Sequence, residues 1–252
     1  MPRVQDKVVF ITGGASGVGR ACATLLAGEG ARVVIADLDA QGGQAVAGEV
    51  GLERALFVRM DISSEEEWAS AMRSALERFG RIDALVNCAA ILPMESIEDA
   101  TLAQWQRTLR VNADGAFLGC QQAIATMKAS GGGSIVNLAS TAALAGFQGM
   151  CAYAASKGAV TALTRNVAAH CRAKGYRIRC NSIHPAGIRT PMTETIFAGA
   201  DPSLLDFDSN PASGVCEPVD VANMVLYLVS DESRFVNGAE LRLDNALLIA
   251  IG

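Results

Sequence analysis

The stretch that decides the fold reads VVFITGGASGVGR, residues 8 to 20. It joins a short apolar run to a segment with helical spacing that starts at Gly17. Glycines let a backbone turn sharply and approach a pyrophosphate closely, and a helix N-terminus offers N–H groups and the positive end of its dipole to that anion. The spacing is GxxxGxG, whereas the commonest dinucleotide fingerprint is GxGxxG. The stretch predicts either a dinucleotide-binding turn or an ordinary tight strand–helix turn.

Asp37 favours the first interpretation. It ends the second apolar run, about twenty residues after the glycine turn, where a carboxylate can accept both hydroxyls of an adenosine ribose. The same charge would repel a 2′-phosphate, and neither Ser16 nor Leu38 supplies a basic side chain to offset it. The sequence therefore favours NAD over NADP, the alternative being that Asp37 is a turn residue at a strand end.

The rest of the chain alternates apolar runs with helical patterns, without a linker, a composition shift or a repeat. The runs are continuous, as in strands covered on both faces, and cover residues 8–11, 33–36, 55–58, 84–86, 134–138, 177–183 and 240–243. Helical spacing covers residues 17–29, 64–79, 104–128 and 153–173. We expect an α/β fold, a single-domain (1–252), doubly wound (Rossmann-type), parallel seven-stranded sheet with helices on both faces. The irregular stretch 189–218 is expected to be a substrate-binding lid.

Composition excludes several classes of protein. Half of the chain is hydrophobic and 19% is charged, which is too apolar for a disordered chain. A net charge of −5 without a basic block argues against nucleic-acid binding, and the longest apolar runs are too short to span a membrane. The N-terminus lacks the pattern of a signal peptide. Seven cysteines without a CxxC motif and only two histidines predict a cytoplasmic protein with no metal site.

Three residues suggest acid–base chemistry. Tyr153 and Lys157 are four residues apart at the start of a helix and therefore share a face. A tyrosine with a pKa near 10 is a poor base, but a nearby ammonium and a cationic nicotinamide favour the phenolate, and a shift of two units takes about 3 kcal/mol. Ser140 follows the strand at 134–138, where ligands bind in such sheets. Taken alone, Tyr153 and Lys157 would also fit a solvated helix face, and Ser140 would also fit a helix cap.

Together with the glycine turn, they give the chain a resemblance to the classical short-chain dehydrogenase/reductase family from near its first residue to its last. The matching elements are Thr12 to Gly19, Asp37, Asp61-Ile62, Asn87 to Ala90, Asn112, Ser140, Tyr153-Ala-Ala-Ser-Lys157 and Pro185 to Thr190. The resemblance implies hydride transfer between NAD and a secondary alcohol or ketone. It implies that Tyr153 is the general base, Lys157 lowers its pKa and binds the nicotinamide ribose, Ser140 orients the substrate oxygen, and Asn112 holds a water.

The resemblance also implies a cofactor site and an assembly. The implied cofactor contacts are Gly13, Ser16, Gly17, Val18, Gly19, Asp37, Leu38, Asp61, Ile62, Asn87, Ala89, Tyr153, Lys157, Pro185, Gly187, Ile188 and Thr190. Two places depart from the family pattern: Cys88 and Ala90 stand in the usual Asn-Asn-Ala-Gly, and Pro185-Ala186-Gly187 replaces Pro-Gly. We expect the changes at Cys88 and Ala90 to tune the site. Helices at 104–128 and 153–173 would form a dimer face within a homotetramer.

A closer resemblance, to the bacterial 3β/17β-hydroxysteroid dehydrogenases, concerns the substrate. It rests on GCQQAIATMK (119–128), IRCNSIHPAGIRTPM (178–192), SDES (230–233) and the stretch from Gly238 to Ala246, which reads Asp244-Asn245-Ala246 where many family members carry Asp-Gly-Gly. It implies a bulky cyclic, hydroxysteroid-like alcohol. Candidate pocket walls are Leu92, Leu144, Phe147, Met150 and Met192, because apolar and thioether groups suit a ring system. The alternatives are a smaller cyclic or terpenoid substrate and a non-catalytic NAD-binding regulator.

Overall fold

A parallel sheet forms the centre of the molecule, of which this computed structural model describes residues 2–250. Its strands are β1 (Val8–Thr12), β2 (Arg32–Asp37), β3 (Ala55–Arg59), β4 (Ala84–Asn87), β5 (Gly133–Leu138), β6 (Ile178–Pro185) and β9 (Glu240–Leu243). They lie in the order β3-β2-β1-β4-β5-β6-β9, and every neighbouring pair is parallel. The predicted single-domain, doubly wound seven-stranded sheet is confirmed.

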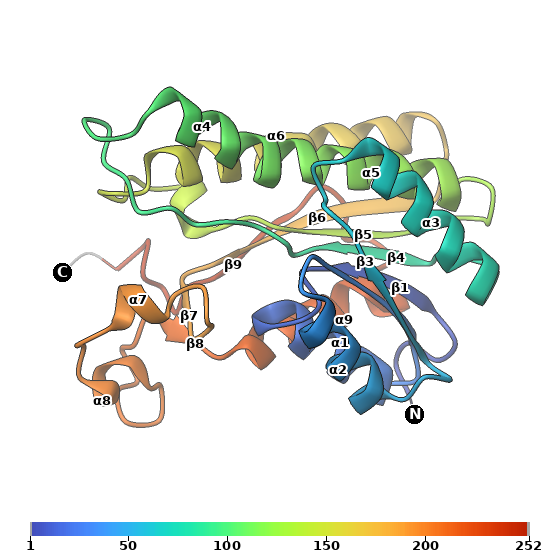
Figure 1. Cartoon of the computed structure of the whole chain (residues 1–252), viewed down its shortest axis with the longest axis horizontal. Helices are drawn as coiled ribbons and strands as arrows, with labels where there is room; N and C mark the ends of the chain where they lie inside the picture. Colours follow the sequence, from blue (N-terminus) through green and yellow to red (C-terminus); the bar gives the residue numbers. More distant parts are fainter. Residues whose placement is uncertain (1, 251–252) are drawn as a thin grey trace.

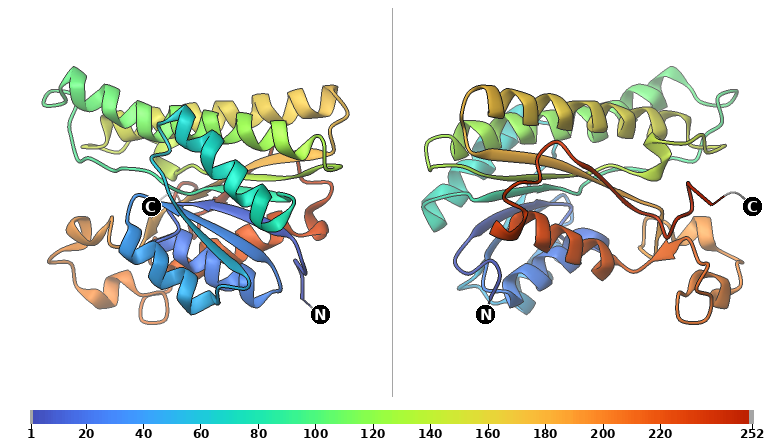
Figure 2. Two further views of the ribbon diagram at one scale, coloured as in Figure 1. Left: turned by 45° about the vertical axis from the view of Figure 1, so that its right-hand side comes forward. Right: turned by 180° about the vertical axis from the view of Figure 1, so that it is seen from behind.

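Helices cover both faces of this sheet (Figures 1 and 2). One layer contains α1 (Gly17–Gly28), α2 (Ala40–Val50) and α9 (Pro218–Val229), and the other contains α3 (Glu65–Phe79), α5 (Gly115–Met127) and α6 (Cys151–Ala173). Strand β1 serves both layers, because successive side chains of a strand point to opposite faces. Val9 and Ile11 pack into the first core, and Val8 and Phe10 pack into the second.

The main helices differ from the sequence-based expectation in three places. The helix expected at 104–128 is divided into α4 (Leu102–Leu109), a π-helical turn η1 (Arg110–Asp114) and α5. The second and third differences are α2 and α9, where no helix was expected. The glycines of α2 hide its helical pattern. Gly43 is required there by packing, since a Cβ on it would lie 2.0 Å from the Phe57 ring.

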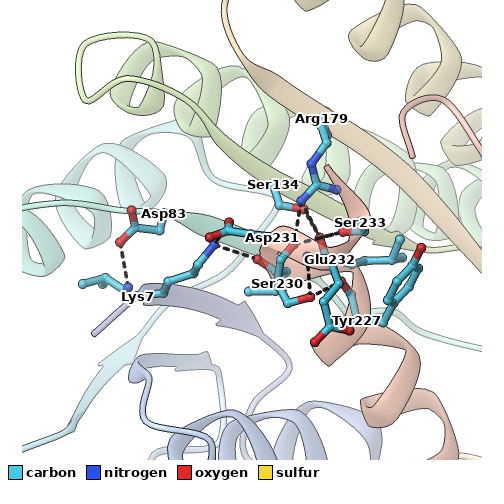
Figure 3. Close-up of polar contacts among 12 residues, drawn as sticks. Lys7, Asp83, Ser134, Arg179, Tyr227, Ser230, Asp231, Glu232 and Ser233 are labelled. Atoms are coloured by element: carbon cyan, nitrogen blue, oxygen red, sulfur yellow. Dashed lines mark hydrogen bonds and ion pairs between the residues drawn. The ribbon is translucent and has the colours of Figure 1, made fainter. Parts of the chain in front are cut away.

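The edge of the sheet at its strand N-termini is closed by polar contacts around the end of α9 and the short helix η3 (Asp231–Ser233) (Figure 3). Arg179 of β6 donates to the carbonyls of Leu228 at 2.8 Å and Ser230 at 3.3 Å, and Ser134 of β5 donates to Leu228 at 2.7 Å. Lys7 reaches the Val229 carbonyl at 3.2 Å. Cations at a helix C-terminus satisfy its free carbonyls and oppose its dipole, so these contacts fix α9 on the sheet.

The opposite edge carries the irregular segment. Within residues 189–218 lie two one-turn helices, α7 (Glu194–Phe197) and α8 (Pro202–Leu205), and strand β8 (Val215–Cys216). Strand β8 pairs with β7 (Gly187–Ile188), which continues directly from β6. The segment stands outside the sheet, beyond the carboxyl ends of the strands (Figure 1). We refer to residues 189–218 as the lid. No helix among residues 2–250 has the length and apolarity needed to cross a membrane.

Candidate active site

A cavity of about 750 Å³ opens where the carboxyl ends of the central strands meet. The strand order reverses between β1 and β4, and doubly wound sheets bind ligands at such a switch point. The structure brings most residues singled out in the sequence to its lining: Gly13, Ser16, Gly17, Val18, Gly19, Asp37, Leu38, Asp61, Ile62, Ala89, Leu92, Ser140, Phe147, Met150, Tyr153, Lys157, Pro185, Gly187, Ile188, Thr190 and Met192.

The glycine turn is shaped for close approach. Gly13 has φ +68°, and a Cβ on Gly19 would lie 2.0 Å from the Gly13 carbonyl oxygen. Ser16, the N-cap of α1, makes no capping bond with its side chain, so the first N–H groups of α1 face the cavity without a side-chain partner. These free donors and the open backbone fit a pyrophosphate.

Asp37 lies at the end of β2 and is held by two backbone N–H groups. Its Oδ2 accepts from Ala15 at 3.0 Å and its Oδ1 accepts from Asp39 at 3.0 Å. Each carboxylate oxygen keeps a further lone pair, so the oriented carboxylate can still accept ribose hydroxyls. Together with the glycine turn, this arrangement fits the adenosine end of a dinucleotide.

Lys157 and Tyr153 lie at the other end of the cavity. The Lys157 side chain is almost fully buried, donates to the Leu138 carbonyl at 2.7 Å and has its Nζ 5.6 Å from the centroid of the Tyr153 ring. Burial lowers the pKa of Lys157 to about 8. Burial also raises the pKa of Tyr153, while a hydrogen bond with Ser140 acts in the opposite direction. For the chain alone, desolvation of the phenolate outweighs the hydrogen bond with Ser140. The lowering of the Tyr153 pKa by Lys157 together with a cationic nicotinamide stays a prediction.

Ser140 is positioned by a residue to which the sequence analysis gave no site role. His184 is fully buried, with Nδ1 3.1 Å from the Ser140 carbonyl and Nε2 2.9 Å from the Ser182 hydroxyl. Burial lowers the pKa of His184, so the ring is neutral at pH 7. The only sequence signal for this role is the place of His184 directly before Pro185, at the end of β6.

The departures from the family pattern leave the loop after β4 intact. The Thr12 hydroxyl accepts from the backbone N–H groups of Cys88 at 3.0 Å and Ala89 at 3.1 Å. These bonds involve main-chain donors, so a cysteine at position 88 does not remove them. Burial raises the pKa of the Cys88 thiol to about 12, which keeps it neutral beside the cavity. Ala90 also lines the cavity, with φ outside the left-handed region.

Asn87 and Asn112 border a second, small cavity of about 10 Å³ that also touches Lys157. The Asn112 amide donates to the Ile91 carbonyl at 2.9 Å and the Ser156 hydroxyl at 3.0 Å, and its Oδ1 accepts from the Ile91 N–H at 2.8 Å. Both amide hydrogens are thus used, which leaves Asn112 only acceptor atoms for a water. A space of this size next to polar groups holds about one water molecule.

Leu144 does not line the main cavity, so its prediction as a pocket wall is corrected. It follows the 3₁₀ turn η2 (Thr141–Ala143), which turns the chain outward and leaves Leu144 41% exposed. The cavity has further walls that the sequence analysis did not name: Arg107, Arg110, Ile196 and Phe197. The two arginines follow the helical spacing of α4 and η1, which alone did not place them beside a ligand. Among residues 2–250, no group of three or more His, Cys, Asp or Glu side chains could hold a metal ion.

Comparison with known proteins agrees with this geometry. Residues 13–246 match the family described as enoyl-(acyl carrier protein) reductase. The chain is 45% identical to 3-beta-hydroxysteroid dehydrogenase of Comamonas testosteroni, over 98% of this chain and 97% of the relative. It is 41% identical to trans-4-hydroxycyclohexanecarboxylate dehydrogenase of Sinomonas cyclohexanicum (96% and 93% covered). It is also 38% identical to the NADP-dependent (R)-specific alcohol dehydrogenase of Lentilactobacillus kefiri (96% of each). The solved structure of levodione reductase superposes with a TM-score of 0.90 at 34% identity, covering 99% of this chain and 100% of the other.

The buried ammonium predicts an unusual pH dependence of stability. In the variant Lys157→Met the titrating group is absent, whereas wild-type Lys157 has a pKa of about 8 when folded and an ordinary value of about 10.4 when unfolded. Between these values the unfolded wild type binds more protons, so its free energy of unfolding rises with pH relative to the variant, by about 3 kcal/mol in all. Below pH 8 the difference should stay constant.

Denaturant unfolding of the two proteins from pH 7 to 10.5 measures this difference. Lys174→Met, at an exposed position directly after α6, is the matched control and should track wild type across the range. A flat difference between wild type and Lys157→Met would contradict the burial of a charged Lys157.

Proposed function

The chain belongs to the short-chain dehydrogenase/reductase family, an oxidoreductase family that uses a nicotinamide cofactor, and from this premise we propose that it is an NAD-dependent dehydrogenase of cyclic secondary alcohols. One observation carries the proposal: Ser140, Tyr153 and Lys157 line the same cavity as the glycine turn and Asp37. The tyrosine and lysine are both present, which counts against a non-catalytic NAD-binding regulator.

The proposed chemistry is acid–base catalysis by Tyr153. A bound nicotinamide would supply the hydride acceptor for oxidation of the carbinol carbon. Tyr153 takes the hydroxyl proton, and Ser140 holds the same oxygen by a hydrogen bond. Burial opposes the phenolate, so Lys157, still mostly protonated at neutral pH with a pKa of about 8, supplies the charge that favours it. In ketone reduction Tyr153 gives the proton back.

The small cavity supports a proton exit beside Lys157. Nζ uses one of its three donors for the Leu138 carbonyl, and Lys157 borders the same 10 Å³ space as Asn112. We propose that a water there accepts from Lys157 and donates to an acceptor atom of Asn112. This places Asn112 in the catalytic set, although its side chain lies outside the main cavity.

We propose that Asp37 makes the chain prefer NAD over NADP. Its carboxylate is fixed at the cavity wall by two N–H groups and would bind the ribose hydroxyls of NAD while repelling a 2′-phosphate. The known relatives include an NADP-dependent enzyme, so membership of the family does not decide the cofactor. The nicotinamide end is proposed to contact Pro185, Gly187, Ile188 and Thr190, which line the cavity beside Lys157.

An apolar wall supports a cyclic substrate. Leu92, Phe147, Met150 and Met192 line the same cavity as Tyr153, and apolar and thioether side chains can pack against ring systems of different shapes. We propose a hydroxysteroid-like substrate, in line with the relative that is a 3-beta-hydroxysteroid dehydrogenase. A smaller cyclic or terpenoid alcohol is the second candidate, favoured by the likeness to levodione reductase and to the cyclohexanecarboxylate enzyme.

We further propose a cytoplasmic homotetramer. Phe117 of α5 is half exposed, which leaves an apolar side chain available for contact with another subunit. All seven cysteines are among the described residues and all are free thiols, which suits a reducing compartment.

Removing the phenol should stop turnover. Tyr153→Phe keeps the ring and its packing but deletes the proton acceptor, so kcat/KM for a cyclic alcohol should fall roughly 100-fold to 10,000-fold. NADH production monitored with hydroxysteroids and monocyclic alcohols measures the loss, and NADH fluorescence measures cofactor binding, which should persist. Tyr176→Phe, whose ring packs against His170 away from the cavity, is the control. Equal turnover by wild type and Tyr153→Phe would exclude the proposed mechanism.

Removing the carboxylate should weaken cofactor discrimination. In Asp37→Ala the ribose hydroxyls lose their acceptors and a 2′-phosphate is no longer repelled, so the ratio of kcat/KM for NAD over NADP should fall about tenfold or more. Asp39→Ala removes a carboxylate two residues away that caps α2 through Gln41 and Gly42, and should leave the ratio unchanged. An unchanged ratio in Asp37→Ala would contradict the proposed binding of the ribose hydroxyls by Asp37.

A further inference from the structure

The turn after the last strand has an unusual backbone. Strand β9 is the edge strand of the sheet and places Leu243 opposite Pro185 of β6. Two residues later, Asn245 has φ +45° and Ala246 has φ +63°, both in the left-handed region. Asparagine tolerates that region better than most residues and glycine tolerates it best, so the conformation itself does not require a side chain at 245.

The Asn245 side chain makes two hydrogen bonds to the lid. Its Nδ2 donates to the carbonyl of Pro211 at 2.8 Å and to the carbonyl of Ser213 at 2.9 Å. The two bonds use both hydrogens of the amide, and a glycine at this position could make neither. A rigid edge of the sheet is thereby tied to residues 211–216, which we call the returning arm of the lid.

The returning arm is itself a wall of the main cavity. Gly214 and Val215 line the cavity, and the Gly214 carbonyl accepts from the Gly187 N–H at 3.0 Å, where Gly187 lines it from β7. A Cβ on Gly214 would lie 3.4 Å from the Leu247 side chain, so the residues after Asn245 also cover the arm from behind. The contacts form a short path from β9 through Asn245 to the wall beside the proposed nicotinamide end.

The outer part of the lid, residues 193–210, is bonded mainly to itself. Asn210 donates to the Leu204 carbonyl at 3.1 Å, and the Ser209 hydroxyl donates to Asp206 at 2.6 Å. One bond links α8 to the base of the lid, from Arg189 to the Leu205 carbonyl at 3.1 Å. Leu204 and Phe207 are exposed, as expected of a segment with few contacts to the sheet.

We propose that Asn245 is a positioning residue that clamps the returning arm, so that movement of the lid is confined to residues 193–210 and the cavity wall at Gly214 and Val215 stays in place for substrate binding. The proposal rests on the proposed function in that the bound molecule is taken to be a cyclic alcohol. Asn245 touches neither the reacting atoms nor the cofactor site. Its loss therefore affects the binding of the alcohol more than the chemical step.

Two substitutions at 245 separate the side chain from the backbone. Asn245→Gly keeps the left-handed turn and removes both donors, and Asn245→Asp keeps the shape but turns an acceptor toward two carbonyl oxygens. Each should raise KM for a bulky cyclic alcohol about tenfold, while kcat changes less than threefold. Ala246→Gly is the matched control. It relieves the backbone strain at the neighbouring left-handed residue, keeps both hydrogen bonds of Asn245 and should leave KM unchanged.

Limited chymotrypsin digestion gives a readout that does not depend on turnover. Chymotrypsin cuts after large apolar residues, and Phe197, Leu204 and Phe207 lie in the lid. Cleavage there should be severalfold faster in Asn245→Gly and Asn245→Asp than in wild type and Ala246→Gly, with unchanged thermal midpoints showing that the sheet remains folded. Masses of the fragments identify the sites.

The two proposals fail in distinguishable ways. If wild type oxidises no cyclic alcohol, the proposed function fails, and the digestion still decides whether the clamp exists. If wild type is active but both 245 variants keep its KM or its rate of lid cleavage, the clamp is overturned. A fall in kcat with an unchanged KM would also overturn it, because that pattern belongs to a residue acting on the chemical step.

Discussion

The ammonium group of Lys157 lies buried at the carboxyl end of β5, bonded to the Leu138 carbonyl, and the rest of the candidate site is arranged around it. Burying a charge is unfavourable, and this desolvation lowers the pKa of Lys157. Helix α6 also carries Tyr153, one turn earlier, and the burial of this side chain disfavours its phenolate form. Two groups that are each poorly suited to their charged form are thus held where each can assist the other.

The sheet also brings the glycine turn and Asp37 into the same cavity as this pair. Because the strand order reverses between β1 and β4, the helices after them diverge and leave a cavity along the carboxyl ends. Thr12 links the two central strands at that point by accepting from Cys88 and Ala89. The glycine turn and Asp37 lie on one side of this link and the Ser140, Tyr153 and Lys157 group on the other, which suits a ligand with an adenosine end and a reactive end.

Local patterns in the sequence predicted the strands, the glycine turn and the Tyr153–Lys157 pair, because continuous apolar runs, a glycine turn and an i, i+4 pair are properties of neighbouring residues. Most of the remaining cavity lining was implied by the resemblance to the family. What they missed depends on contacts between distant segments. The π-helical turn around Asn112 moves that residue to a separate small cavity, and His184 supports Ser140 across two strands. Leu144 turns outward after a 3₁₀ turn that no periodicity indicates. Asn245 stood out only as a departure from Asp-Gly-Gly, and its two bonds to the lid required the tertiary structure.

Isotope transfer tests the central claim most directly, which is that this site moves a hydride between a cyclic secondary alcohol and NAD. The protein is incubated with NAD and a panel of hydroxysteroids and monocyclic alcohols that carry deuterium at the carbinol carbon. Mass spectrometry and proton NMR then locate the label in the NADH that forms. We expect deuterium at C4 of the nicotinamide on one face only, because a site that binds the ring in a single orientation presents one face of it to the alcohol. Binding of NADH without transfer of deuterium from any alcohol in the panel would contradict it.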